Sequence, residues 1–108
     1  MTAAFMISAN QLNQLMGAPE CPVIVDVRRR EAFNLSGRMI ATAEWRDPEQ
    51  AAQWAAGLPG GAVVVYCVHG HEVSQGAAET LRSVGVDARF LEGGIEGFVK
   101  AGGETVVK

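Results

Sequence analysis

The stretch AVVVYCVHGHEV, residues 62–73, decides the fold of this 108-residue chain. Its first five residues form a continuous and mostly β-branched run, which is typical of a strand buried on both faces of a parallel sheet. A second run of this kind, VIVDV, occupies residues 23–27. The polar residues 67–73 then lead into a helical pattern that we expect from about Ser74 to Ser83. A buried strand, a polar loop and a helix in this order favour an α/β domain.

Outward from this stretch, apolar runs alternate with helical patterns, without a linker or a repeat. We expect further strands at residues 5–7, 39–45 and 88–91. Helices are expected to begin at a Ser8–Gln11 capping box, at Arg30, at Asp47-Pro48 and after Gly93-Gly94. The alternation predicts one α/β domain over residues 1–108, with a mostly parallel five-stranded sheet flanked by helices on both faces.

Composition and charge argue against several classes of protein. The chain is 48% hydrophobic and carries a net charge of −3, and its one arginine cluster, residues 28–30, is followed at once by Glu31. We therefore expect no nucleic-acid partner. The apolar residues 1–7 lack the basic flank of a targeting signal, and no apolar run approaches the roughly 18 residues of a membrane helix, so we expect no membrane association. Two cysteines are too few for a disulfide framework, and an unpaired, reduced cysteine indicates the cytoplasm.

Cys67 is the candidate catalytic residue. It directly follows the predicted strand 62–66, and parallel α/β sheets bind their ligands at the carboxyl ends of the strands. A tight loop that contains Gly70 and leads into a helix can turn backbone N–H groups toward one point, where they stabilise an anion. That anion is the thiolate, a persulfide on it, or an oxyanion substrate. The alternative is a small buried side chain, which suits Cys21 in its proline-rich loop better than Cys67 in a polar one.

Other segments resemble one known family in this order and spacing. They are Val25-Asp26-Val27-Arg28 followed by Phe33 and Gly37, then Gln75-Gly76-Ala77-Ala78, and finally residues 91–98, LEGGIEGF. With the hydrophobic strand that ends in Cys67, they make the chain similar to single-domain rhodaneses, the thiosulfate sulfurtransferases, over nearly its whole length. The family usually has tryptophan where this chain has Phe98.

The resemblance implies a ping-pong reaction. The Cys67 thiolate would attack the outer sulfur of thiosulfate or a similar anion and release sulfite. The resulting persulfide would pass its sulfur to cyanide, to a thiol or to an acceptor protein. No cofactor is expected. No metal ion is expected either, because the two loop histidines lack further ligands at a suitable spacing.

The loop departs from the rhodanese pattern in length and in charge. The family usually has six residues here and an arginine after the cysteine, whereas alignment on Ala77 and Ala78 leaves seven, and Val68 replaces the arginine. Seven-residue loops occur in rhodanese-like phosphatases and arsenate reductases, where a final arginine clamps the oxyanion. Val73 occupies that position here. The cation or hydrogen-bond donor that binds an anionic substrate is therefore expected to be His69, His71 or a residue outside the loop.

The remaining polar residues have expected roles of their own. Glu72 is expected to point outward or to serve the helix N-terminus, because a carboxylate that faced the thiol would oppose its ionisation. Asp26 and Arg28 are expected to form an ion pair that braces the strand ends, with direct substrate contact as the alternative. Arg46, after the third strand, is the expected spare cation at the same rim.

The candidate site therefore has three parts. They are the nucleophile Cys67; the anion-stabilising loop of Val68, His69, Gly70, His71, Glu72 and Val73; and the supporting residues Asp26, Arg28 and Arg46. The leading function is a sulfurtransferase. The alternatives are a sulfur-carrier, redox or oxyanion-sensing module with low turnover, and an arsenate reductase or phosphatase-like enzyme that uses the seven-residue loop.

Overall fold

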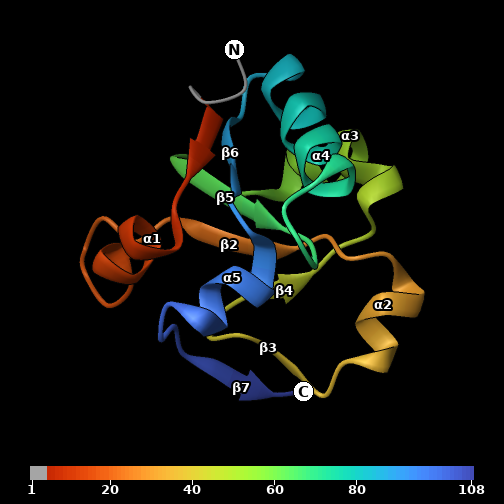
Figure 1. Ribbon diagram of the computed structural model, residues 1–108. Helices are drawn as coiled ribbons and strands as arrows, with labels where there is room; N and C mark the ends of the chain where they lie inside the picture. Colours follow the sequence, from red (N-terminus) through yellow and green to blue (C-terminus); the bar gives the residue numbers. More distant parts are fainter. Residues whose placement is uncertain (1–4) are drawn as a thin grey trace.

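Five parallel strands form the central sheet of the protein, which the computed structural model describes over residues 5–108 (Figure 1). The first four residues of the predicted 1–108 domain, which are also the start of the apolar segment 1–7, lie outside this range. The strands follow the order β1-β6-β5-β2-β4 across the sheet. Their bounds are β1 Met6–Ile7, β2 Val23–Asp26, β4 Glu44–Trp45, β5 Ala62–Tyr66 and β6 Asp87–Leu91. The predicted five-stranded α/β fold is confirmed.

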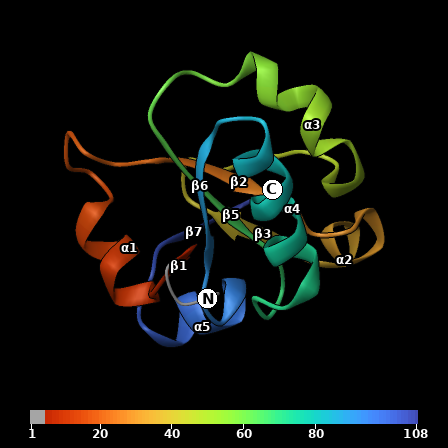
Figure 2. The ribbon, with the colours of Figure 1, turned by 90° about the horizontal axis from the view of Figure 1, so that it is seen from above.

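Helices cover both faces of this sheet, as Figures 1 and 2 show. The two central strands alternate between the faces: Val63 and Val65 of β5 belong to one core cluster, and Val64 and Tyr66 belong to the other. Because both faces are buried, all positions of these two strands except the final Asp26 of β2 are apolar, which explains the long apolar runs in the sequence. The helices are α1 Ala9–Leu15, α2 Arg30–Leu35, α3 Ala51–Trp54, α4 Glu72–Ser83 and α5 Gly94–Lys100.

Each core cluster belongs to one pair of helices. Helices α3 and α4 pack on one face of the sheet. Their buried residues are Ala51 of α3 and Ala77, Ala78 and Leu81 of α4. Residues of α1 and α5 pack on the other face, through Leu12, Ile95 and Phe98. Both clusters thus pack against the same two central strands, β2 and β5.

Local signals place several helix ends as predicted. The Ser8–Gln11 capping box is present, since the hydroxyl of Ser8 accepts the N–H of Gln11 at 3.1 Å and the side chain of Gln11 accepts the N–H of Ser8 at 2.9 Å. Asp47 accepts the N–H of Glu49 at 2.9 Å, but the helix that follows is irregular. It consists of the four-residue α3 between 3₁₀ turns at Pro48–Gln50 and Ala55–Gly57.

The predicted strand at residues 39–45 is wrong. The chain makes two short strands there, β3 (Arg38–Ile40) and β4, and turns between them at Thr42, whose φ is 70°. Only β4 joins the central sheet. β3 pairs antiparallel with β7 (Thr105–Val107), a strand that the sequence analysis did not predict, in a separate two-stranded sheet.

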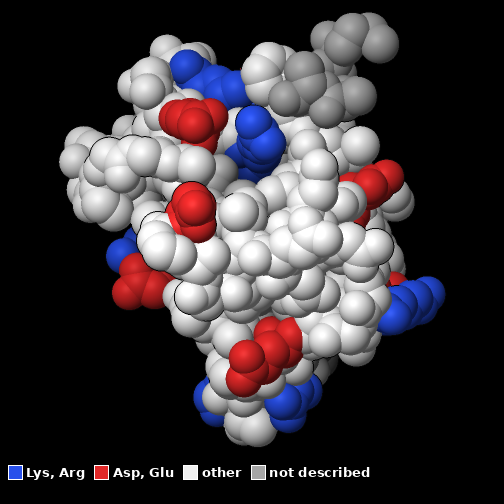
Figure 3. All heavy atoms as spheres, turned by 90° about the vertical axis from the view of Figure 1, so that its left-hand side faces the viewer, with Lys and Arg blue, Asp and Glu red and all other residues white. Residues whose placement is uncertain are grey.

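Figure 3 shows the left-hand side of the molecule as it stands in Figure 1. Acidic and basic side chains are interspersed there, without a large area of one sign. Among the helices of residues 5–108, none combines the length and the apolar composition that a membrane crossing requires.

Candidate active site

β5 places Cys67 at the carboxyl edge of the central sheet, where ligands of parallel sheets bind. The side chain of Cys67 is 6% exposed. It lines a cavity of about 210 Å³ whose wall combines the loop with the β2–α2 connection. The lining residues are Arg28, Arg29, Ala32, Cys67, Val68, His69, His71, Glu72 and Val73. The structure thus brings most of the predicted site residues together around one cysteine.

The first turn of α5 holds the start of the loop. The N–H of Ile95 donates to the carbonyl of Cys67 at 3.0 Å, and the N–H of Glu96 donates to the carbonyl of Val68 at 3.2 Å. Gly94 permits this approach, because its φ is +60° and a Cβ there would collide with both carbonyl groups. The loop conformation therefore depends on α5 as well as on its own sequence.

Gly70 is the second point at which the loop needs a glycine. Its φ is +78°, and a Cβ would lie 2.7 Å from the nitrogen of Gly93 and from the carbonyl oxygen of Leu91. The carbonyl of Gly70 in turn accepts the side-chain amide of Gln75 at 3.0 Å. Close backbone contact on one side and a side-chain donor on the other fix this turn.

The backbone N–H groups of the loop are free to bind a ligand. Within residues 5–108, the N–H groups of residues 68–74 donate to no protein acceptor. In a trans peptide the N–H points opposite to the preceding carbonyl, so the N–H groups of Val68 and His69 point away from α5. Unpaired backbone donors around a partly enclosed cavity favour an anion, because an anion satisfies several of them at once.

Ser74 is a site residue that the sequence analysis missed. The thiol of Cys67 donates to its hydroxyl oxygen at 3.1 Å, and that hydroxyl lies 3.5 Å from the carbonyl oxygen of His71. Ser74 is fully buried, although it lies in the first turn of α4, where serine usually meets water. When the thiol loses its proton, the same hydroxyl can rotate and donate to the sulfur. The position of Ser74 at the predicted start of the helix, directly after the loop, was the sequence signal that could have identified it as a site residue.

Ser74→Ala is expected to slow the alkylation of Cys67 by iodoacetamide at neutral pH about tenfold, since a hydrogen bond to a charged group contributes about 1.5–3 kcal/mol. The rate is followed by intact mass in a Cys21→Ser background. Ser83→Ala is the matched control, because Ser83 lies exposed at the end of the same helix and donates to the carbonyl of Thr80. Equal rates for the two variants would show that Ser74 does not support the thiolate.

The two histidines lie at the exposed rim of the cavity. Nε2 of His69 lies 3.1 Å from Oε1 of Glu96 on α5, and both side chains are more than half exposed. The ring of His71 lies 5.9 Å from that of His69, measured between centroids. Glu72 is exposed and begins α4, which agrees with its expected place at the helix N-terminus. Within the described chain, no three His, Cys, Asp or Glu residues gather to hold a metal ion.

The expected ion pair between Asp26 and Arg28 is present and buried. Their closest atoms are 2.6 Å apart, and their side chains are 0% and 2% exposed. Tyr66 donates to the same carboxylate at 2.8 Å, and its oxygen accepts the N–H of Ile40 at 3.1 Å. The guanidinium of Arg28 also donates to the carbonyl of Arg38 at 3.0 Å. These bonds join β2, β5 and β3 at the ends of the strands.

This network raises the pKa of Tyr66 and of Arg28. Burial raises the pKa of Tyr66, and the negative charge of Asp26 raises it further, so the phenol stays neutral. Burial by itself lowers the pKa of Arg28, but its hydrogen bonds and its attraction to Asp26 raise the pKa overall. Arg28 therefore remains a charged brace whose guanidinium is already occupied.

Arg46 does not supply the expected cation. Its guanidinium lies 3.1 Å from Glu44 and 3.3 Å from the carbonyl of Trp45, and it is not among the residues that line the Cys67 cavity. The reason is that Arg46 follows β4, the edge strand, which β2 separates from the strand β5 that carries Cys67. Arg29 lines the cavity instead. Arg29 follows Arg28 at the carboxyl end of the predicted strand 23–27. This position next to the expected site was the sequence signal that could have identified Arg29.

Comparison with known families agrees with this geometry. The family model described as the rhodanese-like domain matches residues 8–101. This chain belongs to the rhodanese-like family. A search of curated proteins found no match.

Solved structures with the rhodanese-like fold resemble the chain over most of its length. A rhodanese-related protein from Thermoplasma volcanium is 26% identical, with a TM-score of 0.80 over 95% of this chain and 98% of that one. A full-length protein from Lactobacillus plantarum is 24% identical, with a TM-score of 0.86 over 98% and 90%. A protein of unknown function from Rhodopseudomonas palustris, described as a possible tyrosine phosphatase, is 23% identical, with a TM-score of 0.76 over 95% and 83%.

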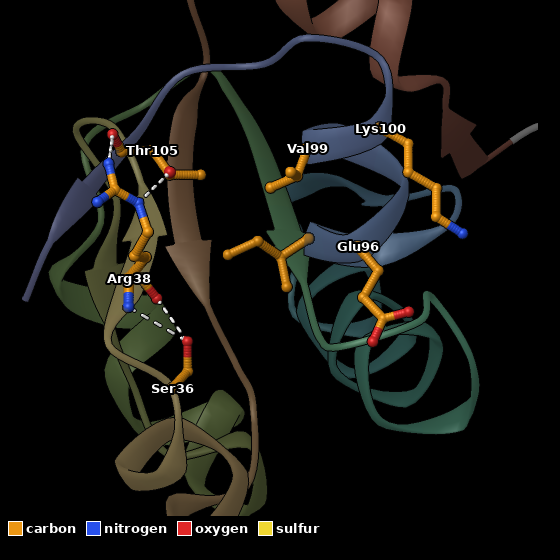
Figure 4. Close-up of a pocket in the computed structure, with 7 residues that line it drawn as sticks. Ser36, Arg38, Glu96, Val99, Lys100 and Thr105 are labelled. Carbon is orange, nitrogen blue, oxygen red and sulfur yellow. Dashed lines mark hydrogen bonds between the residues drawn. The ribbon is translucent and has the colours of Figure 1, made fainter.

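A second, larger cavity of the rhodanese-like domain lies outside the cysteine loop. It measures about 460 Å³ and separates α5 from the β3–β7 sheet. Figure 4 shows Val99 on the α5 side, across from Arg38 and Thr105, which are joined by hydrogen bonds. Glu96 lines this cavity and also contacts His69, which lines the Cys67 cavity, so this pair of side chains connects the walls of the two cavities.

Proposed function

We propose that this rhodanese-like domain is a sulfurtransferase that carries sulfane sulfur on Cys67. The observation that supports the proposal most directly is the position of a buried thiol beside seven residues, 68–74, whose backbone N–H groups have no acceptor in the described chain. A cavity of about 210 Å³ suits a small anion. Thiosulfate or a similar sulfur anion is the proposed donor.

The proposed reaction has two displacement steps. In the first, the Cys67 thiolate forms a bond to the outer sulfur of thiosulfate, the S–S bond of thiosulfate breaks, and sulfite leaves with the bonding electrons. The loop N–H groups stabilise the negative charge on the terminal sulfur of the persulfide. In the second, cyanide or the thiolate of a small molecule or protein attacks that terminal sulfur, and the Cys67 thiolate leaves.

In this proposal the main chain carries the role that arginine has in related loops. Val68 and Val73 offer no charge, and the rim histidine His69 already contacts Glu96. Backbone donors keep their charge distribution at any pH at which the protein folds, and they need no reorganisation when an anion forms. The loop therefore stabilises an anion through its shape, which Gly70 and Gly94 impose.

Incubation with thiosulfate is expected to raise the intact mass of the protein by one sulfur atom. Cys67→Ser should abolish this gain, whereas Cys21→Ser should retain it, because Cys21 lies outside the cavity and its thiol donates to the carbonyl of Pro22. Addition of cyanide should then remove the extra mass and release thiocyanate. No mass gain, or a gain that persists in Cys67→Ser, would overturn the proposal.

The rate of the cyanide step separates an enzyme from a sulfur carrier. Repeated turnover with thiosulfate and cyanide supports the sulfurtransferase. A persulfide that forms once and leaves only in the presence of a protein acceptor supports a carrier module instead.

Hydrolysis of phosphate esters is a second candidate, because the loop from Cys67 to Val73 has seven residues. The missing arginine at Val73 argues against it, since a bidentate clamp on the oxyanion is absent from that position. Aryl phosphate hydrolysis that is lost in Cys67→Ser would support this candidate over the first.

A further inference from the structure

We propose that Arg29 selects anionic sulfur donors for Cys67, in particular donors in which the transferable sulfur is bonded to a sulfonyl group. Thiosulfate and organic thiosulfonates share this –SO₂–S⁻ chemistry. The choice of substrate rests on the sulfurtransferase proposed above, whereas the attraction of Arg29 for an anion at Cys67 does not.

Arg29 is the one arginine of the cavity wall whose guanidinium is not already engaged. The guanidinium of Arg28 is held by Asp26 and by the carbonyl of Arg38, and its side chain is 2% exposed. Arg29 is exposed, and among residues 5–108 its side chain has no ion pair, hydrogen bond or aromatic contact. An approaching anion therefore meets a guanidinium that forms no ion pair or hydrogen bond in the described chain, although Glu49 and Glu72 line a neighbouring hollow with it.

The backbone of Arg29 is fixed although its side chain is free. Arg29 is the N-cap residue of α2, and its carbonyl accepts the N–H of Phe33 at 2.9 Å. Ala32, on the first turn of the same helix, lines the cavity as well. The side chain thus starts from a set position on the β2–α2 connection, while the thiol and the free N–H groups belong to the loop after β5.

Two carboxylates near the mouth of the cavity oppose the entry of an anion. Glu72 lines the same cavity and is exposed, so its carboxylate repels an incoming anion. His69 lies next to Glu96, which adds a second carboxylate at the rim. Arg29 offsets this negative field, and its planar guanidinium matches the two oxygens of a sulfonyl group in a way that an ammonium group does not.

A pair of alkylating reagents tests the inference without any enzymatic assay. Iodoacetate and iodoacetamide have nearly the same size, and both react when the thiolate displaces iodide, but only iodoacetate is an anion. The ratio of their rates at Cys67, measured by intact mass in a Cys21→Ser background at low ionic strength, reports the attraction of the cavity for an anion.

Arg29→Gln is expected to lower the iodoacetate-to-iodoacetamide ratio about tenfold, a typical size for the loss of one steering charge at a cleft. Arg29→Lys should restore most of the ratio, and added salt should lower the ratio of the unmodified protein toward that of Arg29→Gln. Arg30→Gln is the matched control, because it removes the same charge from the next residue. Arg30 lies over the ring of Trp45 at 4.5 Å and does not line the Cys67 cavity.

The outcomes separate the two proposals. An unchanged ratio in Arg29→Gln, or an equal fall in Arg30→Gln, overturns the role of Arg29. A ratio that falls only in Arg29→Gln supports that role even if thiosulfate leaves no sulfur on Cys67, and in that case only the proposed function fails. Where persulfide does form, Arg29→Gln should raise the KM for thiosulfate about tenfold with little change in kcat.

Discussion

Asp26→Ala should lower the free energy of unfolding by about 3–5 kcal/mol, the usual cost of removing one partner from a buried ion pair. The carboxylate of Asp26 receives hydrogen bonds from the guanidinium of Arg28 and from the hydroxyl of Tyr66, and all three side chains are at most 2% exposed. The variant leaves a buried cation without a counter-ion and a phenol without an acceptor. Urea unfolding followed by circular dichroism measures the loss.

A conservative variant and a surface pair provide the controls. Asp26→Asn keeps a hydrogen-bond acceptor while it removes the charge, so its loss should be smaller and still measurable if Asp26→Ala does not fold. Glu44→Ala removes the carboxylate of the exposed pair with Arg46 and should cost at most about 1 kcal/mol. A loss for Asp26→Ala within the range of Glu44→Ala would contradict a structural role for the buried pair.

Gly94→Ala should lower the rate of persulfide formation on Cys67 about 100-fold, because displacement of reacting groups by about 1 Å has effects of this size. The added Cβ would collide with the carbonyl groups of Cys67 and Val68 at a residue whose φ is +60°. Both obstacles are backbone, so no side-chain rotation can relieve them. The loop must move away from α5, and its N–H groups then turn away from the cysteine.

Gly97→Ala separates this effect from a general disturbance of α5. Its Cβ would lie 3.6 Å from the carbonyl oxygen of Glu92, an ordinary van der Waals distance, and the helix itself favours alanine. Persulfide formation should therefore be close to that of the unmodified protein, and thermal unfolding of both variants shows whether the fold is retained. Similar rates for the two variants would mean that the contact between α5 and the loop does not position Cys67.

Much of the fold could be predicted because local patterns and tertiary structure agree. The runs at Val23–Asp26 and Ala62–Tyr66 are apolar except for the final Asp26, because helices cover both of their faces, and this continuous pattern can be read from the sequence. The capping box at Ser8 depends only on residues within one turn of helix. The position of Cys67 followed from the end of one such run.

The β3–β7 pair could not be predicted in the same way. Ile40 and Thr105 are partners in its register, although most of the chain separates them in sequence. Neither strand has an alternating or continuous pattern of useful length, and the left-handed turn at Thr42 has no glycine to indicate it. Pairing over such a distance depends on how the rest of the chain packs.

Within the site, the backbone positions were predicted better than the side chains. Gly70 and the helix after it were expected, whereas the contact of Ser74 with Cys67 depends on α4 beginning at Glu72. Arg46 was the wrong cation because its strand lies at the edge of the sheet, with β2 between it and β5, and the order of the strands cannot be read from the sequence. A sequence pattern indicates where a strand ends more reliably than where a long side chain reaches.

The small β3–β7 sheet also implies that stability is unevenly distributed in this domain. It has three residue pairs, and two residues of β7, Val106 and Val107, are 40% and 73% exposed, whereas β5 lies in the middle of the central sheet. Segments with few buried contacts open locally at a lower free energy than global unfolding requires. Opening of β7 would remove one wall of the cavity beside α5 while the parallel sheet keeps Cys67 in place.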